Sequence, residues 1–223
     1  MSDFKKIENK AIILLSGGLD SAVSLGISKE KYDIKLALTF DYGQISAQNE
    51  IKAAKDFCKY YNIPLKIITL EFLKDLTPNS LITGKVPDGI QQNSASVWVP
   101  NRNGLFLNIA GCFADKNNYD YIIIGANKEE AQNFSDNTQD FINKINEEFL
   151  YSTSNHPKVV APLINFNKND IVKKALEYSI PLEYTKSCYK GKEKHCGMCE
   201  SCTRLKNALI ANNDTKYLKV LFE

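Results

Sequence analysis

Residues 11–26 read A-I-I-L-L-S-G-G-L-D-S-A-V-S-L-G, and this stretch decides the fold. The apolar run at residues 11–15 predicts a buried strand, because a short apolar run that ends in a glycine turn is typical of a central strand. From residue 20 to residue 30, apolar side chains recur with helical spacing. The stretch therefore predicts a strand, a tight turn at residues 16–21 and a helix.

Units of the same kind continue along the chain. We expect further strands at residues 35–40, 65–70 and 121–124, and an edge strand at 159–162. We expect a polar loop at residues 77–96 and helices at 46–61, 103–114, 136–150, 167–179 and 202–212, the fourth with Asn167 as its N-cap. This alternation predicts an α/β fold with a doubly wound parallel sheet, in which ligands bind beyond the carboxyl ends of the strands.

The composition is that of an ordinary globular protein. The chain has 223 residues, of which 43% are hydrophobic and 24% charged, and these values exclude a disordered or fibrous protein. Its 28 lysines and arginines against 26 acidic residues give a formal charge of +2, which is too small for a dedicated nucleic-acid binder. No apolar run reaches the roughly 18 residues of a membrane span, and residues 1–6 lack the apolar region of a signal peptide. We therefore expect a cytoplasmic protein with no membrane partner.

The turn at residues 16–21 has the features of a phosphate site. Backbone N–H groups and the positive end of the helix converge on any anion there, and the two glycines let it approach closely. The turn lacks the lysine of an ordinary P-loop, but its two serine hydroxyls suit a pyrophosphate leaving group, and Asp20 can help to hold Mg²⁺. The alternative is a plain glycine turn with Asp20 as the N-cap. The full string S-G-G-x-D-S arises by chance at roughly one position in a million, which favours the nucleotide site.

Four of the six cysteines fall within fifteen residues, and this clustering indicates a metal site rather than a disulfide scaffold. The pattern C-x7-C-x2-C-x2-C predicts one structural, tetrahedral zinc per chain, bound by Cys188, Cys196, Cys199 and Cys202. His195 in place of one cysteine, an iron–sulfur cluster and a redox C-x-x-C pair are the alternatives. The other two cysteines, Cys58 and Cys112, lie on apolar helix faces and are expected to be small buried hydrophobes.

The turn resembles the S-G-G-x-D-S signature of the N-type ATP pyrophosphatases, residue for residue, at Ser16, Gly17, Gly18, Asp20 and Ser21. Enzymes of that superfamily cut ATP to AMP and pyrophosphate. They adenylate a carbonyl or carboxylate oxygen, and a nitrogen or sulfur nucleophile then displaces AMP. The resemblance implies the adenine nucleotide alpha hydrolase-like form of the doubly wound fold, with ATP as a substrate and Mg²⁺ beside it.

With the cysteine pattern added, the chain resembles the 7-cyano-7-deazaguanine synthase family of queuosine biosynthesis from end to end. Further matches are F-D-Y-G-Q at residues 40–44, V-P-N-R-N at 99–103 and S-C-Y at 187–189. The resemblance implies an ATP-dependent carbon–nitrogen ligase that converts 7-carboxy-7-deazaguanine and ammonia to 7-cyano-7-deazaguanine through an acyl adenylate and an amide. We expect an ATP-pyrophosphatase domain over residues 1–180 and a zinc-binding lobe with a closing helix over 181–223, and a homodimer stays open.

The resemblance also implies roles for individual residues. The expected catalytic residues are Asp20, Ser21, Arg102 and Asp136. The nucleotide is expected to contact Leu15, Ser16, Gly17, Gly18, Leu19, Asp20, Ser21, Phe40, Tyr42 and Gln44. The planar guanidinium of Arg102 can pair with a phosphate or with the substrate carboxylate, and Asp136 can accept hydrogen bonds from the guanine-like edge of the base. The alternatives are a surface arginine and an aspartate that caps the following helix.

Two segments depart from the family pattern, and both belong to the substrate side. Residues 130–137 read E-A-Q-N-F-S-D-N where the family has acidic-aromatic-x-G-Y-P-D-C, so the aspartate is kept and the cysteine is not. Ile45 and Ser46 replace an Arg-His pair. An enzyme that stops at the amide or uses another carboxylate therefore stays open. So does an RNA-binding or tRNA-modifying module, which the small net charge disfavours.

Overall fold

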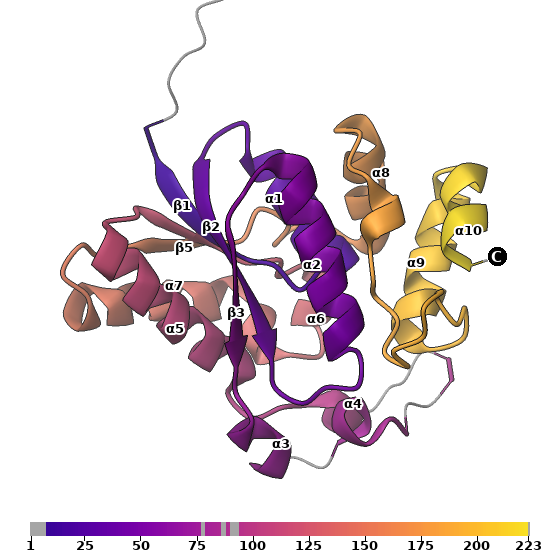
Figure 1. Ribbon diagram of the computed structural model, residues 1–223, viewed down its shortest axis with the longest axis horizontal. Coiled ribbons are helices and arrows are strands. Elements are labelled where there is room, and N and C mark those ends of the chain that lie inside the picture. The colour runs from indigo at the N-terminus through magenta and orange to yellow at the C-terminus, as the bar shows by residue number, and fades with distance from the viewer. Residues whose placement is uncertain (1–7, 77–78, 86–87, 90–93, 223) are drawn as a thin grey trace, which may run out of the picture.

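The computed structural model describes residues 8–76, 79–85, 88–89 and 94–222 (Figure 1). The opening residues 1–6 and parts of the expected loop at 77–96 lie outside these ranges. Five strands form one parallel sheet in the order β3-β2-β1-β4-β5: β1 (Lys10–Leu14), β2 (Asp33–Asp41), β3 (Leu65–Thr69), β4 (Tyr121–Ile123) and β5 (Lys158–Val160). The expected doubly wound parallel sheet, with β5 as an edge strand, is confirmed.

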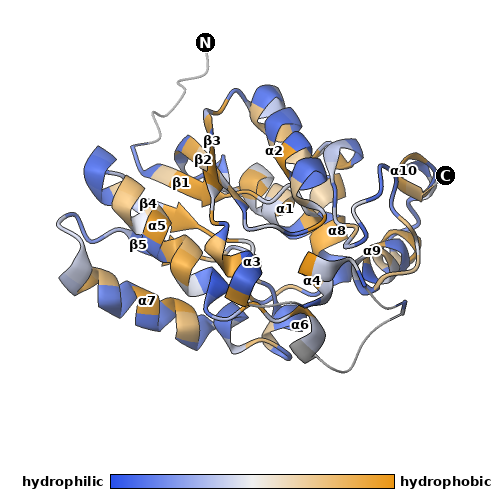
Figure 2. Ribbon diagram, turned by 60° about the horizontal axis from the view of Figure 1, so that its bottom comes forward, coloured by the Kyte–Doolittle hydropathy of each residue, from blue (hydrophilic) through white to orange (hydrophobic). Residues whose placement is uncertain are grey.

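Helices cover both faces of the sheet (Figure 1). On one face, α1 (Leu19–Ser28), α2 (Ala47–Tyr61) and α8 (Lys168–Glu177) form a hydrophobic cluster with the strands, and α9 (Glu200–Ala211) and α10 (Thr215–Phe222) extend this cluster beyond α8. The other face packs against α5 (Arg102–Asn117), α7 (Gln139–Ser152) and the short α3 (Phe72–Leu76). The remaining elements are short: α4 (Ser80–Thr83), α6 (Lys128–Ala131), and the 3-10 turns η1 (Ser94–Val97), η2 (Ser135–Asn137) and η3 (Leu182–Tyr184). In Figure 2 the strands are orange, while outer helices such as α7 alternate between orange and blue, as amphipathic helices do.

The position of β1 in the sheet explains why residues 11–15 are all apolar and do not alternate between apolar and polar side chains. Ile13 belongs to the hydrophobic cluster on the α1 face, and Ile12 and Leu14 belong to the cluster on the α5 face. Successive side chains of a strand point to opposite faces, so a strand covered on both sides needs apolar residues throughout. The connection after β1 runs to β2 on one side of it, whereas the connection after its other neighbour, β4, runs to β5 in the opposite direction. A crevice therefore opens at the carboxyl ends of β1 and β4.

Two expectations for helix starts were wrong. The helix expected from residue 136 begins at Gln139, because Thr138 is its N-cap and accepts the N–H of Phe141 at 3.2 Å. Asp136 therefore lies in η2, before the helix, and does not cap it. In the expected loop at 77–96, the side chain of Asn79 accepts two backbone N–H groups and starts α4. The capping side chains of Asn79 and Thr138 thus set the starts of α4 and α7, which hydrophobic periodicity does not reveal.

The C-terminal region contains one helix more than expected. The expected helix after the cysteines is α9, and the chain then reverses at Asn213, whose φ of 55° is left-handed. Asp214 accepts the N–H of Tyr217 and starts α10, which buries Tyr217 and Leu221 in the cluster on the α1 face. Asn167 caps α8, as expected, in a capping box with Asp170.

The expectation for the two isolated cysteines is half right. Cys58 is buried on α2, but Cys112 is exposed on α5, because the apolar side of α5 is formed by other residues of that helix.

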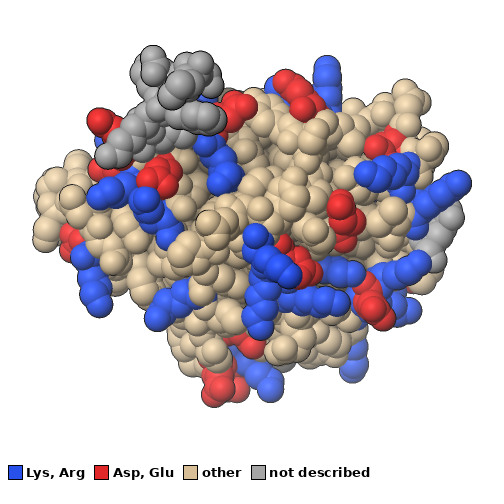
Figure 3. All heavy atoms as spheres, turned by 45° about the horizontal axis from the view of Figure 1, so that its top comes forward, with Lys and Arg blue, Asp and Glu red and all other residues tan. Residues whose placement is uncertain are grey.

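Of the helices within the described ranges, none combines the length and the apolar character that crossing a membrane requires. On the face in Figure 3, acidic side chains are interspersed among the lysines and arginines.

Candidate active site

The turn after β1 places two hydroxyl groups at the N-terminus of α1. Gly17 has a φ of 78°, and Gly18 is the N-cap of the helix. The Oγ atoms of Ser16 and Ser21 lie 3.1 Å apart, Ser16 Oγ accepts the N–H of Gly18 at 3.3 Å, and Ser21 Oγ donates to the carbonyl oxygen of Gly18 at 3.1 Å. Hydroxyl donors and the positive helix end therefore meet at one point, which is the arrangement an anion needs.

Gly17 is required by the close approach of α2. A Cβ atom at this position would lie 2.5 Å from Cβ of Ala53 and 2.9 Å from the carbonyl oxygen of Glu50. Together with the left-handed φ, this contact leaves room only for glycine. The function of Gly17 in the turn is thus to pack against α2, and it is not among the described residues that line the cavity.

Asp20 forms an ion pair with a lysine that lies 148 positions later in the sequence. Nζ of Lys168, the first residue of α8, lies 2.5 Å from Oδ2 of Asp20 and 3.6 Å from Oε1 of Glu130. Burial raises the pKa of Asp20, and the Lys168 ammonium opposes that shift. Burial lowers the pKa of Lys168, but the carboxylates of Asp20, Glu130 and Glu129 outweigh it and raise that pKa, so the ammonium stays charged. The turn that lacks a lysine of its own thus receives one from α8.

Lys168 is a residue of the cavity wall, paired with Asp20, that sequence reasoning missed. It lies 148 positions after Asp20, so no pattern local to the turn could reveal it. A signal existed, because Lys168 follows the Asn167 cap at the start of a helix that comes after a strand. Residues at such a position reach the carboxyl edge of a parallel sheet, where the turn also lies.

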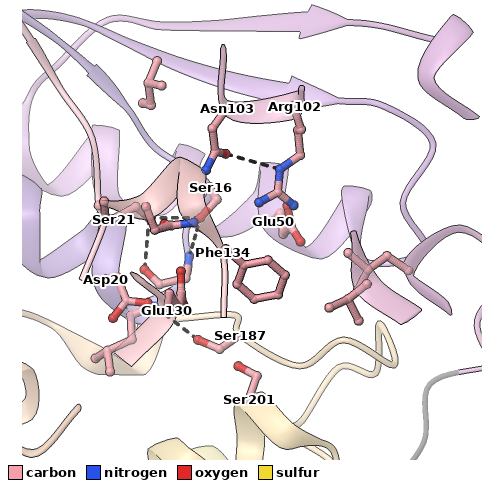
Figure 4. A pocket seen from close by; sticks show the side chains of 18 of the residues that line it. Ser16, Asp20, Ser21, Glu50, Arg102, Asn103, Glu130, Phe134, Ser187 and Ser201 are labelled. Carbon is pink, nitrogen blue, oxygen red and sulfur yellow. Dashed lines mark hydrogen bonds between the residues drawn. The ribbon is translucent and has the colours of Figure 1, made fainter. Parts of the chain in front are cut away.

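A single cavity joins the turn to an aromatic wall (Figure 4). Phe40 stacks on Phe106 with 3.9 Å between ring centroids, and Trp98 stacks on Phe134 with 6.1 Å. In Figure 4 the Phe134 ring lies between Arg102 and Glu50 on one side and Glu130 and Asp20 on the other. Stacked aromatic rings and a phosphate-type turn in one cavity suit a ligand that combines flat bases with phosphates.

Arg102 is partly buried at the start of α5. Its guanidinium carbon lies 5.8 Å from the centroid of the Tyr42 ring, and its Nη1 donates to Tyr42 Oη at 3.4 Å. Burial lowers the pKa of Arg102, but the interactions with Tyr42 and Asp136 raise it, so the side chain stays cationic. Arg102 therefore presents a fixed positive charge to the cavity.

Asp136 lies in the segment where the chain departs from the family pattern. Its Oδ1 accepts Nδ2–H of Asn137 at 3.0 Å, and its backbone carbonyl accepts Nδ2–H of Asn103 at 3.3 Å. Burial raises the pKa of the Asp136 carboxyl, and the Arg102 guanidinium opposes that shift. Arg102 and Asn103 from the start of α5 and Asp136 from η2 thus converge at one part of the cavity.

Gln44 and Glu50 brace the loop between β2 and α2. Gln44 accepts the N–H of Tyr42 at 2.9 Å and donates to the carbonyl oxygen of Phe40 and to Glu50 Oε2. Glu50 also accepts the hydroxyl of Ser46 at 2.5 Å, and burial raises the pKa of its carboxyl. Glu50 lines the cavity, whereas Gln44 is not among the described lining residues.

Of the expected site residues, the cavity brings together Leu15, Ser16, Gly18, Leu19, Asp20, Ser21, Phe40, Tyr42, Arg102 and Asp136.

The four clustered cysteines form a second centre. All four Sγ atoms lie within 4.8 Å of one another, and those of Cys196 and Cys202 are 3.8 Å apart. Four sulfurs at the usual distance from one tetrahedral metal ion lie about 3.8 Å from each other. The backbone N–H groups of Met198 and Cys199 point at Cys196 Sγ. The cluster can therefore hold a metal ion, and His195 lies outside it, because its Nε2 accepts the N–H of Ser187.

A comparison with known protein families decides the relationship. The model of the family described as "Queuosine biosynthesis protein QueC" matches residues 10–213. The chain belongs to the QueC family.

Curated relatives support the same assignment. A protein of Methanosarcina mazei is 48% identical over 210 residues, which cover 87% of this chain and 91% of the relative. One from Carboxydothermus hydrogenoformans is 46% identical over 213 residues, which cover 91% of this chain and 99% of the relative. Both relatives are named 7-cyano-7-deazaguanine synthase. As a member of the QueC family, the chain is an ATP-dependent enzyme of queuosine biosynthesis.

Solved structures show the fold that this QueC-family member shares. A 4-thiouridine synthetase in complex with RNA and with bound ATP has a TM-score of 0.52 and 20% identity, over 96% of this chain and 52% of that one. NMN synthetase from Francisella tularensis has a TM-score of 0.50 and 14% identity, over 97% of this chain and 83% of that one. The QueC-family chain therefore shares its α/β fold with these two proteins.

Proposed function

We propose that this chain is an AMP-forming ligase that converts 7-carboxy-7-deazaguanine and ammonia into 7-cyano-7-deazaguanine with two molecules of ATP. The observation that carries the proposal is one cavity in which the S-G-G-x-D-S turn faces Arg102 and the segment at residues 130–137. The names of the relatives support the choice of substrate.

The reaction needs two activations of the same carbon atom. A carboxylate oxygen attacks the α-phosphorus of ATP and releases pyrophosphate; ammonia then displaces AMP, and the amide forms with loss of a proton. The amide oxygen attacks a second ATP in the same way and releases pyrophosphate, and loss of AMP and of the two amide protons then gives the nitrile. Each activation turns a poor leaving oxygen into AMP, so the protein must hold the reactants in line and stabilise pyrophosphate as its charge develops.

The turn is proposed to bind the pyrophosphate part of ATP. The backbone N–H groups of Gly18 and Leu19 and the hydroxyls of Ser16 and Ser21 lie where they can donate to phosphate oxygens. The Lys168 ammonium adds positive charge beside them. A positive charge at this point favours the leaving group more than the bound substrate, because charge builds up there during the reaction.

Asp20 fits the proposed Mg²⁺ site. Its Oδ1 is buried and has no hydrogen-bond partner within the described ranges, while Oδ2 is held by Lys168. Mg²⁺ prefers oxygen ligands and usually binds to one or two carboxylates together with substrate phosphates. When bound, Mg²⁺ would neutralise phosphate charge, and Asp20 would hold it.

The other side of the cavity is proposed to bind the two flat bases. Leu15, Phe40 and Tyr42 lie at the ends of β1 and β2 and offer an apolar surface to adenine. Arg102 is proposed to pair with the substrate carboxylate or the α-phosphate, because its charge is fixed and its guanidinium is planar. Asp136 is proposed to accept hydrogen bonds from the amino and ring N–H groups of the guanine-like edge.

The metal in the cysteine cluster is proposed to be one structural zinc ion. Four thiolates fill a tetrahedral site and leave no position open for water. Residues 181–223 are proposed as the zinc-binding lobe, which is supported by the position of all four ligands between η3 and the first turn of α9.

The test is to incubate the protein with ATP, Mg²⁺, ammonium and 7-carboxy-7-deazaguanine and to identify the nucleotide and base products by chromatography and mass spectrometry. We expect AMP and pyrophosphate only when the base is present. Asp20→Ala is expected to lose this release by about a hundredfold or more, whereas Asp140→Ala, an exposed acid on α7, is expected to keep it. Formation of ADP, or normal turnover by Asp20→Ala, would refute the proposed function.

A further inference from the structure

The loop that enters the cysteine cluster lies directly on the phosphate turn. The N–H of Lys186 donates to the carbonyl oxygen of Gly17 at 2.9 Å. The next residue, Ser187, accepts the N–H of Leu19 on its Oγ at 3.1 Å (Figure 4). The second of these hydrogen bonds joins residues that are 168 positions apart in the sequence. The lobe with the cysteines therefore completes one side of the turn.

The position of the Ser187 hydroxyl is that of an anion oxygen. The N–H of Leu19 belongs to the first turn of α1, where N–H groups have no partner inside the helix and commonly donate to phosphate oxygens; here it donates to the Ser187 hydroxyl instead. A Cβ atom on Gly18 would lie 3.4 Å from Ser16 Oγ and 3.8 Å from Ser187 Oγ. Both hydroxyls thus border the same point, and Ser187 lines the cavity together with Lys186.

Ser187 is held in place by a buried histidine. Its N–H donates to Nε2 of His195 at 3.1 Å, and His195 is only 4% exposed. The backbone N–H of His195 donates to the carbonyl oxygen of Leu221 on α10, and its ring centroid lies 5.3 Å from that of Phe222. Ser187 precedes Cys188, and His195 precedes Cys196. Two cluster cysteines and a helix therefore fix this pair of residues from both sides.

We propose that Ser187 is a pyrophosphate-binding residue that the cysteine lobe brings to the turn, and that His195 is its positioning residue. The inference rests on the proposed function and extends it to this lobe. When pyrophosphate or the corresponding part of ATP binds, the N–H of Leu19 bonds to a phosphate oxygen, and the Ser187 hydroxyl rotates to donate to the same group. The lobe then acts in substrate binding as well as in stability.

The first test measures the binding of inorganic pyrophosphate with Mg²⁺, and separately of AMP, by isothermal titration calorimetry. Loss of a hydrogen bond to a charged group predicts that Ser187→Ala weakens pyrophosphate binding about tenfold or more. We expect AMP affinity to change less than about twofold, since AMP carries no pyrophosphate, and metal content to stay as in the wild type. Thr203→Ala is the matched control, because it removes a hydroxyl from the same lobe that bonds to Met198 and not to the turn.

The second test separates positioning from folding. His195→Leu removes the acceptor for the Ser187 N–H and is expected to weaken pyrophosphate binding, whereas His195→Gln keeps an acceptor and is expected to restore it. Unchanged pyrophosphate affinity in Ser187→Ala would overturn the proposal, and so would equal losses of pyrophosphate and AMP affinity. A wild-type protein that binds AMP but no pyrophosphate would overturn the proposed function as well. If the wild type binds pyrophosphate, the results for the variants test only the proposal for Ser187 and His195.

Discussion

At the scale of single residues, the site depends on charges that come from distant parts of the chain. Lys168 reaches Asp20 from α8, and Arg204 on α9 bonds to Glu129 at 2.8 Å and to Glu200 at 2.7 Å. Each of these cations is paired with carboxylates in a partly buried setting, where an unpaired charge is costly. The positive charge beside the turn is therefore fixed before any phosphate arrives.

Asp136→Ala tests base recognition at this scale. We expect the KM for the base to rise about tenfold or more, because a hydrogen bond to a charged group is lost, and the KM for ATP to stay constant. Thr138 caps α7 independently of Asp136, so the thermal midpoint is expected to stay close to that of the wild type. Steady-state kinetics with Asp140→Ala as the control gives the answer. An unchanged KM for the base would remove Asp136 from the substrate site.

At the scale of elements, the hydrophobic pattern predicted two kinds of element. These are fully buried strands such as β1, and helices such as α2 that bury one apolar side and expose the other. The pattern did not predict α4 or the true start of α7, which depend on the side chains of Asn79 and Thr138. It also missed α10, because the reversal at Asn213 is a backbone conformation and carries no hydropathy signal. Local capping chemistry, not periodicity, decided these boundaries.

The contact between the phosphate turn and α2 gives a prediction at this scale. Gly17→Ala is expected to cost about 1–2 kcal/mol of left-handed strain and more through the contacts with Ala53 and Glu50. Gly84→Ala has a similar φ of 74° but meets only the end of the Ile45 side chain, which is exposed and can move. Urea unfolding should therefore show a clearly larger loss for Gly17→Ala. Equal losses would mean that α2 does not restrict the turn.

The cysteine cluster gives a second prediction for an element. Cys199→Ser is expected to lower zinc content and the thermal midpoint together, because the binding energy of a structural zinc is folding energy. Cys199 is fully buried at the N-terminus of α9, so loss of the metal leaves that helix without its anchor. Cys112→Ser, on the exposed side of α5, is the matched control and should change neither quantity. Elemental analysis and calorimetry measure both. A stable Cys199→Ser protein with a full complement of zinc would refute the ligand set.

At the scale of the whole molecule, the sheet order brings the site together. The turn follows β1, Tyr42 follows β2, the segment at residues 130–137 comes after β4, and Lys168 comes after β5. Helices α9 and α10 share one hydrophobic cluster with α1 and α8, so residues 200–222 pack into the same core as the sheet. The site is thus built at one edge of the sheet by residues from most of the chain.

This arrangement explains which half of the site could be predicted from the sequence. Ser16, Asp20 and Ser21 lie in one short string, so their meeting follows from a single turn. Lys168 and Ser187 come from distant segments, and their approach to the turn depends on the strand order and on the docking of the C-terminal lobe. Hydrophobic periodicity specifies neither of these, and only the folded chain reveals them.

The most direct measurement follows oxygen atoms from the substrate into AMP. The protein is supplied with 7-carboxy-7-deazaguanine labelled with ¹⁸O at both carboxylate oxygens, together with ATP, Mg²⁺ and ammonium, and AMP and base products are analysed by mass spectrometry. Two adenylations of the same carbon predict a nitrile without label and two molecules of AMP per base, each with one ¹⁸O atom. Unlabelled AMP, or an amide that keeps one ¹⁸O as the final product, would contradict the account.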